Sequence, residues 1–156
     1  MQLTFLFLGK TKESYLAAGI DDFSKRLKRY AQVSIKIIKE KKWASKESDA
    51  KIKGEEGETL LANIPPSSFV VALDRTGRQI DSEELATLLT KWEGRGVRSV
   101  TFVIGGPLGL ADKVLAQANV TLSLSKMTFT HEMARLILLE QLYRAFSINA
   151  GTGYHK

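Results

Sequence analysis

The sequence predicts an α/β fold, a three-layer sandwich built on a mainly parallel β-sheet. Short apolar runs, typical of buried parallel strands, alternate with longer segments in which apolar residues recur every three or four positions, the period of an amphipathic helix. The 156 residues are 44% hydrophobic and 26% charged, which matches one globular domain in length and composition. We therefore expect residues 1–156 to form a single domain.

Five segments have the pattern of strands. The first, Leu3 to Leu8, is continuously apolar, as expected for a strand that is buried on both faces. The others are predicted at residues 33–38, 69–73, 99–104 and 120–124. Pro65 and Pro66 separate the third strand from the segment before it, because proline interrupts a helix.

Helices are expected between these strands, at residues 16–30, in a weaker segment ending near 64, at 81–94, from 112 onward and at 130–147. In the first, apolar residues follow one another at spacings of four, three, four and three, which places one apolar stripe along the helix. Asp81 and Glu84 have the spacing of a capping box at the start of the third helix, and Gly94 or Gly96 is expected to close it.

The final helix has no single apolar stripe. Its apolar residues, from Met133 to Ile148, point in nearly every direction around the helix, which is expected for a helix buried on more than one side. A domain of this length has little material with which to cover a terminal helix. We therefore expect a second subunit to pack on it in a twofold interface, so that the protein is a homodimer.

Cysteine and histidine usage excludes several classes of site. The absence of Cys excludes disulfides, Cys-ligated zinc, iron–sulfur clusters and a thiolate nucleophile. The only histidines are His131 and His155, so no metal site is expected. The apolar start of the chain is too short for a signal peptide or a membrane span, and we expect a cytoplasmic protein that does not contact membranes.

Positive charge is concentrated in one part of the chain. The net charge is +6, whereas residues 25–53 hold eleven Lys and Arg against three acidic residues, a local net charge of +8. One interpretation is a solvated lysine-rich face. Because this run covers a helix end, a strand and a loop, it is also able to form one phosphate-binding patch, which favours a nucleic-acid partner.

A glycine-rich loop follows the predicted strand at 99–104. Gly105 and Gly106 stand where open α/β sheets place their ligand-binding loops. The loop has neither the dinucleotide pattern G-x-G-x-x-G nor the phosphate-loop pattern, so neither cofactor class is expected. A tight turn is one interpretation of these glycines. The other is that they let backbone groups approach a flat ligand closely.

Two further motifs carry chemically useful side chains. His131 to Arg135 differs from a zincin motif because an arginine replaces the second histidine, so zinc hydrolysis is excluded. Glu140 and Arg144 have the spacing of a helix-surface salt bridge, worth about 0.3–0.5 kcal/mol. The tail, Tyr154 to Lys156, combines an aromatic ring that can stack on a base, an imidazole that can move a proton and an ammonium that can bind phosphate.

Four motifs together resemble one family. They are Ile104–Gly109, Leu122–Phe129, Leu142–Ala145 and Tyr154–Lys156. With them the sequence closely resembles, from end to end, the bacterial large-subunit rRNA pseudouridine N3-methyltransferases, small members of the knotted SPOUT class. The resemblance implies a trefoil knot in the C-terminal third of the chain. Knots are very rare, and the hydrophobic pattern alone argues against one.

The resemblance also implies S-adenosylmethionine as the methyl donor, held by three loops that follow strands. The corresponding cofactor-binding residues are Leu73, Gly105, Gly106, Leu124, Ser125, Lys126, Met127, Thr128 and Phe129. One departure is Thr130, where relatives usually have a proline that fixes φ and lacks an N–H.

The reaction implied is methylation of N3 of a pseudouridine in 23S rRNA, on the assembled ribosome or on naked rRNA. His155 and Glu140 are the candidate bases for the N3 proton, and Arg144 is the candidate cation that stabilises the deprotonated base. Tyr154 would stack on the target base, and Lys156 with the basic run would hold phosphates. The tail is short enough to serve the cofactor site of a partner subunit.

Two other classes of function share some of these features. A non-catalytic rRNA-binding or ribosome-associated module would keep the basic run and the tail, with ligand loops that no longer bind a cofactor. An enzyme that methylates a small molecule or a protein is disfavoured by the localised basic run.

Overall fold

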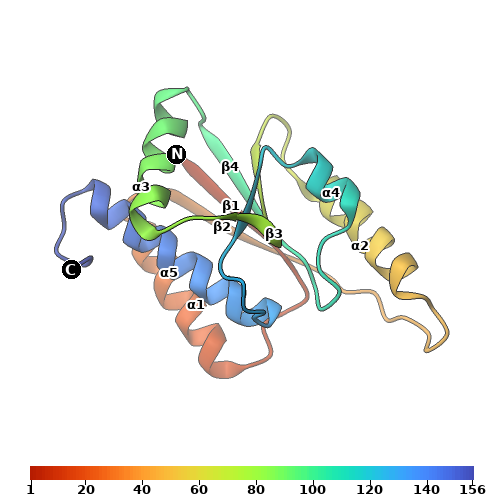
Figure 1. Ribbon diagram of the computed structural model, residues 1–156. Coiled ribbons are helices and arrows are strands. Elements are labelled where there is room, and N and C mark those ends of the chain that lie inside the picture. The colour runs from red at the N-terminus through yellow and green to blue at the C-terminus, as the bar shows by residue number, and fades with distance from the viewer.

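The computed structural model describes residues 1–156, and its strands and helices alternate along the chain (Figure 1). The strands are β1 (Gln2–Leu8), β2 (Gln32–Ile38), β3 (Phe69–Gln79), β4 (Ser99–Ile104) and β5 (Val120–Ser123). The helices are α1 (Ser14–Leu27), α2 (Asp49–Asn63), α3 (Ser82–Gly94), α4 (Asp112–Gln117) and α5 (His131–Asn149). This alternation confirms the predicted α/β class.

All five strands form one sheet, in the order β2-β1-β4-β3-β5, and every pairing between neighbouring strands is parallel. Almost every side chain of β1 and β4 is buried, as their continuous apolar sequences predict for inner strands of a parallel sheet. The mainly parallel sheet expected from the sequence is therefore confirmed.

Helices cover both faces of this sheet, α1, α3 and α5 on one side and α2 and α4 on the other (Figure 1). Successive side chains of β1 alternate between the two cores. Phe5 lies in the larger core, where its ring stacks on that of Phe102 with centroids 5.3 Å apart, and Leu6 lies in the smaller one. The three layers are confirmed, while the trefoil knot stays a prediction.

Two elements differ in length from their predictions. α1 ends at Leu27, and Tyr30 lies in the turn that follows, where its ring stacks on that of Phe146 with centroids 5.8 Å apart. The apolar period continues past the helix because Tyr30 packs against α5. β3 continues beyond Leu73 because, after a shift of register, it pairs with β5 again at Arg78.

The predicted capping box of α3 is present. Asp81 Oδ1 accepts a hydrogen bond from the backbone N–H of Glu84 at 2.7 Å, and Glu84 Oε2 accepts one from the N–H of Asp81 at 3.0 Å. The helix ends at Gly94, and Gly96, with φ of +80°, forms the left-handed turn after it. Both predicted ends of this helix are confirmed.

Elements of the same chain cover much of the final helix. α5 packs between α1 and α3 (Figure 1) and buries Leu138, Leu142 and Ala145 against them and the sheet. Met133 and Ile137 remain partly exposed. The apolar circumference of α5 therefore does not by itself require a second subunit, and the homodimer stays a prediction.

The first turn of α5 is held against the β1–α1 loop by a buried carboxylate. Glu132 accepts hydrogen bonds from the backbone N–H groups of Lys12, at 3.0 Å, and Glu13, at 3.1 Å. Glu13 is the N-cap of α1 and forms no side-chain cap of its own, so Glu132 satisfies donors that the helix leaves open. Burial opposes ionisation of Glu132, but these hydrogen bonds outweigh it and hold its pKa below the ordinary value of 4.5.

Arg135, one turn further along α5, is the largest fully buried side chain. Its guanidinium donates hydrogen bonds to the carbonyl oxygen of Leu8 and, at 3.0 Å, to Thr11 Oγ1, and it lies 4.8 Å from the centre of the Phe7 ring. Burial lowers the pKa of Arg135, which the nearby Glu132 opposes, and an arginine remains protonated in proteins. Arg135 thus ties α5 to the carboxyl end of β1.

We expect Arg135→Ala to lower the free energy of unfolding by about 3–5 kcal/mol, because it leaves buried polar groups of the β1–α1 loop without a partner. Urea denaturation followed by circular dichroism measures this loss. Arg95→Ala, which removes an exposed arginine without an ion pair, is the matched control and should change stability by less than about 0.5 kcal/mol. A similar small change in Arg135→Ala would contradict the anchoring role.

Candidate functional site

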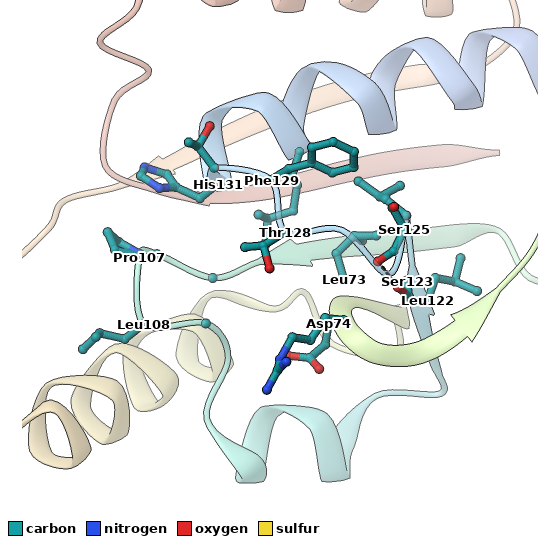
Figure 2. A pocket seen from close by; sticks show the side chains of 18 of the residues that line it. Leu73, Asp74, Pro107, Leu108, Leu122, Ser123, Ser125, Thr128, Phe129 and His131 are labelled. Carbon is teal, nitrogen blue, oxygen red and sulfur yellow. Dashed lines mark hydrogen bonds between the residues drawn. The ribbon is translucent and has the colours of Figure 1, made fainter.

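A cavity of about 860 Å³ opens at the carboxyl ends of β3, β4 and β5 (Figure 2). Three chain segments form its wall: Leu73–Arg75 in β3, Gly105–Gly109 after β4 and Leu122–Thr130 through the end of β5. His131 and Ala134 of α5 and Lys53 of α2 also line it. Open parallel sheets bind their ligands at this edge, so the cavity is the first candidate for a functional site.

Most of the residues predicted to bind a cofactor line this cavity. They are Leu73, Gly105, Gly106, Leu124, Ser125, Met127, Thr128 and Phe129. Lys126 is not among the lining residues, and its side chain is exposed. The backbone N–H of Met127 donates a hydrogen bond to Ser125 Oγ at 3.0 Å, which closes a small turn with Lys126 in its middle.

Several polar residues of the wall, among them Asp74, Lys53 and His131, are not among the predicted cofactor-binding residues. Asp74 follows Leu73, and its Oδ1 atom accepts hydrogen bonds from the N–H of Thr76, at 2.9 Å, and from its hydroxyl, at 2.6 Å. Lys53 reaches the cavity from α2. The place of His131 directly after the third loop is a sequence signal of its position here.

His131 is partly buried in the wall, with 22% of its side chain exposed. Burial, and after it the charge of the Arg135 guanidinium, lower the pKa of His131 below its ordinary value of 6.5. The imidazole is therefore neutral at pH 7, able both to donate and to accept a hydrogen bond at the cavity.

The two glycines after β4 have different surroundings. A Cβ atom at Gly105 would lie 2.6 Å from the carbonyl carbon of Gly109, so this position needs glycine for the turn itself. The N–H of Gly109 closes that turn by donating to the Gly106 oxygen at 3.0 Å. At Gly106 a Cβ would lie in ordinary contact with Glu56, 3.5 Å from its Oε2 atom, so the turn itself does not require glycine there. The tight-turn interpretation fits Gly105, and close approach of a ligand to the backbone of Gly106 stays a prediction.

Three of the four predicted catalytic residues form a cluster at the other end of α5. Glu140 Oε1 accepts hydrogen bonds from Arg144 Nε, at 3.1 Å, and from the Tyr154 hydroxyl, at 3.0 Å. The Arg144 guanidinium carbon lies 4.7 Å from the centre of the Tyr154 ring. The salt bridge predicted between Glu140 and Arg144 is therefore present, and it holds the tail against the helix.

Protonation in this cluster follows from its contacts. The hydrogen bond to Glu140 raises the pKa of Arg144, so that the guanidinium stays charged. Burial, followed by the hydrogen bond to Glu140, raises the pKa of Tyr154 above 10.0, so that the phenol stays neutral. The second oxygen of Glu140 accepts a hydrogen bond from Gln141 Nε2 at 2.8 Å. Both oxygens of this carboxylate are therefore occupied.

His155 lies apart from that cluster. Its Nε2 atom is 3.6 Å from Glu83 Oε1 of α3, and its Nδ1 atom is buried without a hydrogen-bond partner. One ring nitrogen of this candidate base is thus free of competing contacts with the protein.

The cavity and the tail cluster lie far apart in one chain. Ala134 lines the cavity, and Arg144 follows ten residues later on the same helix, which corresponds to about 15 Å along the helix axis. In Figure 1 the C-terminus lies beyond the end of α5 that is remote from the loops of the cavity. The structure does not bring the predicted cofactor and catalytic residues together within one subunit.

The basic run at residues 25–53 is partly neutralised by local ion pairs. Lys25, Arg26, Lys41 and Lys51 each lie within 2.9 Å of a carboxylate. The remaining cations have no ion pair, and they lie at the end of α1, on the edge strand β2, on the loop after it and in α2: Lys28, Arg29, Lys36, Lys39, Lys42, Lys46 and Lys53. This distribution follows one edge of the molecule.

Comparison with family models matches residues 1–155 to the model described as "Predicted SPOUT methyltransferase". The chain belongs to the SPOUT methyltransferase family. It is similar, at 49% identity over 156 residues and the full length of both chains, to a Desulfotalea psychrophila protein named Ribosomal RNA large subunit methyltransferase H. A Clostridium novyi protein of the same name is 46% identical, again over the full length of both chains.

The fold of this SPOUT methyltransferase is also similar to that of a solved structure. That structure, a probable methyltransferase from Bordetella pertussis, aligns with a TM-score of 0.58 and 11% identity over 93% of this chain and 96% of its own. At such low identity the likeness shows a shared fold alone. In the SPOUT methyltransferase described here, no group of three metal-ligating side chains comes together, and no helix is long and apolar enough to cross a membrane.

We expect Gly106→Val to weaken S-adenosylmethionine binding to this SPOUT methyltransferase by about tenfold or more, because the new side chain fills space beside the cavity loop. Isothermal titration calorimetry measures the affinity. Gly94→Val is the control, since Gly94 lies at the end of α3 with no atom near its Cβ position. Equal affinity in Gly106→Val and Gly94→Val would place the ligand elsewhere.

Proposed function

We propose that this SPOUT methyltransferase transfers the methyl group of S-adenosylmethionine to N3 of a pseudouridine in 23S rRNA, in the cytoplasm. The observation that carries the proposal is the full-length similarity, at 49% identity, to a protein named Ribosomal RNA large subunit methyltransferase H. The polar, aromatic and cationic side chains of the tail cluster supply the chemistry that such a reaction needs.

The cavity residues fit the methyl donor. Apolar side chains such as Leu73, Leu122 and Phe129 offer packing surface, and the backbone at Gly106 offers hydrogen-bonding groups without a side chain in the way. A volume of about 860 Å³ lies within the range of cofactor sites. When bound, S-adenosylmethionine supplies a methyl group that its sulfonium already activates.

The protein's part in the chemistry is to position the base and to manage the N3 proton. Arg144, held in place by Glu140, stabilises the negative charge that develops on the base as N3–H ionises. Both oxygens of Glu140 are occupied by donors, which favours an orienting role for this residue. His155 is then the candidate base for the N3 proton, and because its Nδ1 atom is buried, the tail must shift before that nitrogen reaches a substrate.

The distance between the cavity and the tail cluster within one subunit supports a homodimer. Because Arg144 lies about 15 Å along α5 from the cavity wall, the tail of one protomer acts at the cavity of its partner in this proposal. The partly exposed Met133 and Ile137 of α5 then belong to the subunit interface. The substrate, rRNA in the ribosome, approaches a site to which both subunits contribute.

The function is tested by incubating the purified protein with S-adenosylmethionine and large ribosomal subunits that lack the modification. Mass spectrometry of nuclease fragments is expected to show one methyl group on a pseudouridine. Binding of rRNA without methyl transfer, together with no calorimetric signal for S-adenosylmethionine, would contradict the enzyme and support a non-catalytic rRNA-binding module.

Sharing of sites between subunits is tested by mixing two inactive variants. Gly106→Val has a weakened cofactor site and is inactive when S-adenosylmethionine is kept well below its raised dissociation constant, and deletion of Tyr154–Lys156 lacks the tail. After exchange of subunits, about half of the dimers are mixed and each regains one complete site, so about one quarter of the wild-type activity is expected. Mixtures that stay inactive would show that each tail serves the cavity of its own subunit. In a separate sedimentation experiment, a mass near 17.3 kDa would exclude the dimer.

A further inference from the structure

A second hollow, of about 530 Å³, lies at the amino ends of the strands, at the edge of the sheet opposite the methyl-donor cavity. Its polar lining comes from three separate chain segments: Gln2 in β1, Lys28–Gln32 between α1 and β2, and Arg98 before β4. Backbone hydrogen bonds join these segments, because Gln2 N–H donates to the Arg98 oxygen at 2.8 Å and Gln32 N–H to the Met1 oxygen at 3.1 Å.

The hollow is strongly cationic. Lys28, Arg29 and Arg98 are exposed, none of them forms an ion pair, and no Asp or Glu lines the hollow. Cations at the end of a helix are stabilised by its dipole, which accounts for Lys28 and Arg29 after α1. That effect does not account for Arg98, which reaches the same hollow from the loop before β4.

The neutral polar groups of the hollow are also suited to phosphate. Gln2, Tyr30 and Gln32, whose side chains carry hydrogen-bond donors, line the hollow together with two arginines. Arginine binds phosphate oxygens in a bidentate manner, and glutamine and tyrosine are common partners of the nucleic-acid backbone. The lining therefore suits a phosphodiester group of a nucleic acid.

An aromatic contact chain connects this hollow with the tail. The ring centre of Tyr30 lies 6.0 Å from that of Tyr143, which lies 4.7 Å from that of Tyr154. Tyr30 and Tyr154 are therefore no more than about 11 Å apart between ring centres. One RNA strand is able to place a nucleoside at Tyr154 and neighbouring phosphates in the hollow.

We propose that the hollow formed by Lys28, Arg29 and Arg98, with Gln2, Gln32 and Tyr30, binds phosphodiester groups of the rRNA strand that flank the nucleoside presented to Tyr154. The identity of the RNA rests on the proposed function. The hollow is separate from the unpaired lysines beyond β2, and it adds Arg98, which lies outside the basic run of the sequence.

The test compares Arg98→Gln with Arg95→Gln. Both arginines are exposed and unpaired and lie in the segment between α3 and β4, but only Arg98 lines the hollow. Fluorescence anisotropy with an RNA stem-loop, between about 50 and 200 mM KCl, gives the affinity and its salt dependence. Arg98→Gln is expected to weaken binding about fivefold near 0.1 M salt and to reduce the slope of log K against log salt by about 0.7–0.9.

Arg95→Gln should leave both quantities close to those of the wild type. Equal effects of the two substitutions would overturn the proposal, because they would indicate diffuse attraction by net charge. Lys28→Gln with Arg29→Gln provides a second measurement on a different element, and circular dichroism confirms that each variant is folded. If these variants keep the wild-type slope of log K against log salt, the proposal that the hollow binds phosphate would also be overturned.

A parallel assay with large ribosomal subunits separates the hollow from the proposed function. Arg98→Gln should raise the KM for subunits about fivefold, whereas the tail deletion should act mainly on kcat. A wild-type protein that binds RNA but transfers no methyl group would contradict the proposed function. The anisotropy measurements would still show whether the hollow binds RNA phosphates. Weaker binding of Arg98→Gln to subunits, with unchanged binding to deproteinised rRNA, would assign the hollow to an acidic protein partner and overturn the proposal.

Discussion

The buried contacts of Glu132 and Arg135 determine where α5 begins, and the rest of the site depends on that position. Both side chains fasten the helix to the loop after β1, Glu132 through backbone N–H groups and Arg135 through the Leu8 oxygen. The loop from Leu122 to Thr130 therefore has both of its ends fixed, one in the sheet and the other at this anchor. Since a helix is stiff, the same anchor sets the place of Glu140 and Arg144 at its far end.

A buried charge of this kind is expensive, and Arg135 meets the cost through Leu8, Thr11 and the Phe7 ring while its Nε atom is buried without a hydrogen-bond partner. Removing either partner leaves an ionised or polar group without compensation in a low-dielectric environment. The contacts join segments more than a hundred residues apart in the sequence, so the strand at the start of the chain and the helix at its end are held in register by charge as well as by packing.

Sequence reasoning succeeded where the signal is local. The capping box at Asp81, the apolar run of β4 and the glycines after it each depend on neighbours within a few residues, and all three are where the pattern places them. The second part of β3 and the surroundings of α5 depend on other elements: β3 is prolonged by β5, and α5 is covered by α1 and α3. A hydrophobic pattern records that a side chain is buried, but it does not record which element covers it.

The residues of the candidate site also fall into two groups, those that the local sequence predicts and those whose position depends on distant elements. Loops that follow strands could be assigned to a cavity from the sequence, because parallel strands end at one edge of the sheet. Lys53 could not, since nothing near it in the sequence indicates that α2 faces this space, whereas Asp74 directly follows the predicted Leu73. The contacts among Glu140, Arg144 and Tyr154 were anticipated only for the first pair, which follows helix spacing.

The tail cluster imposes one last condition on the proposed reaction. The guanidinium of Arg144 lies over the ring of Tyr154, and Tyr143 meets that ring at an interplanar angle of 71°, so the aromatic surface intended for a base is already in use. For a base to stack on the face of Tyr154 that Arg144 covers, the guanidinium must leave that face. Glu140 still holds Arg144 on α5 when that happens, so the cation stays beside the base instead of escaping to solvent. Base stacking and placement of the positive charge are then coupled by one carboxylate, which is a reason for Glu140 to orient the site and not to act as its base.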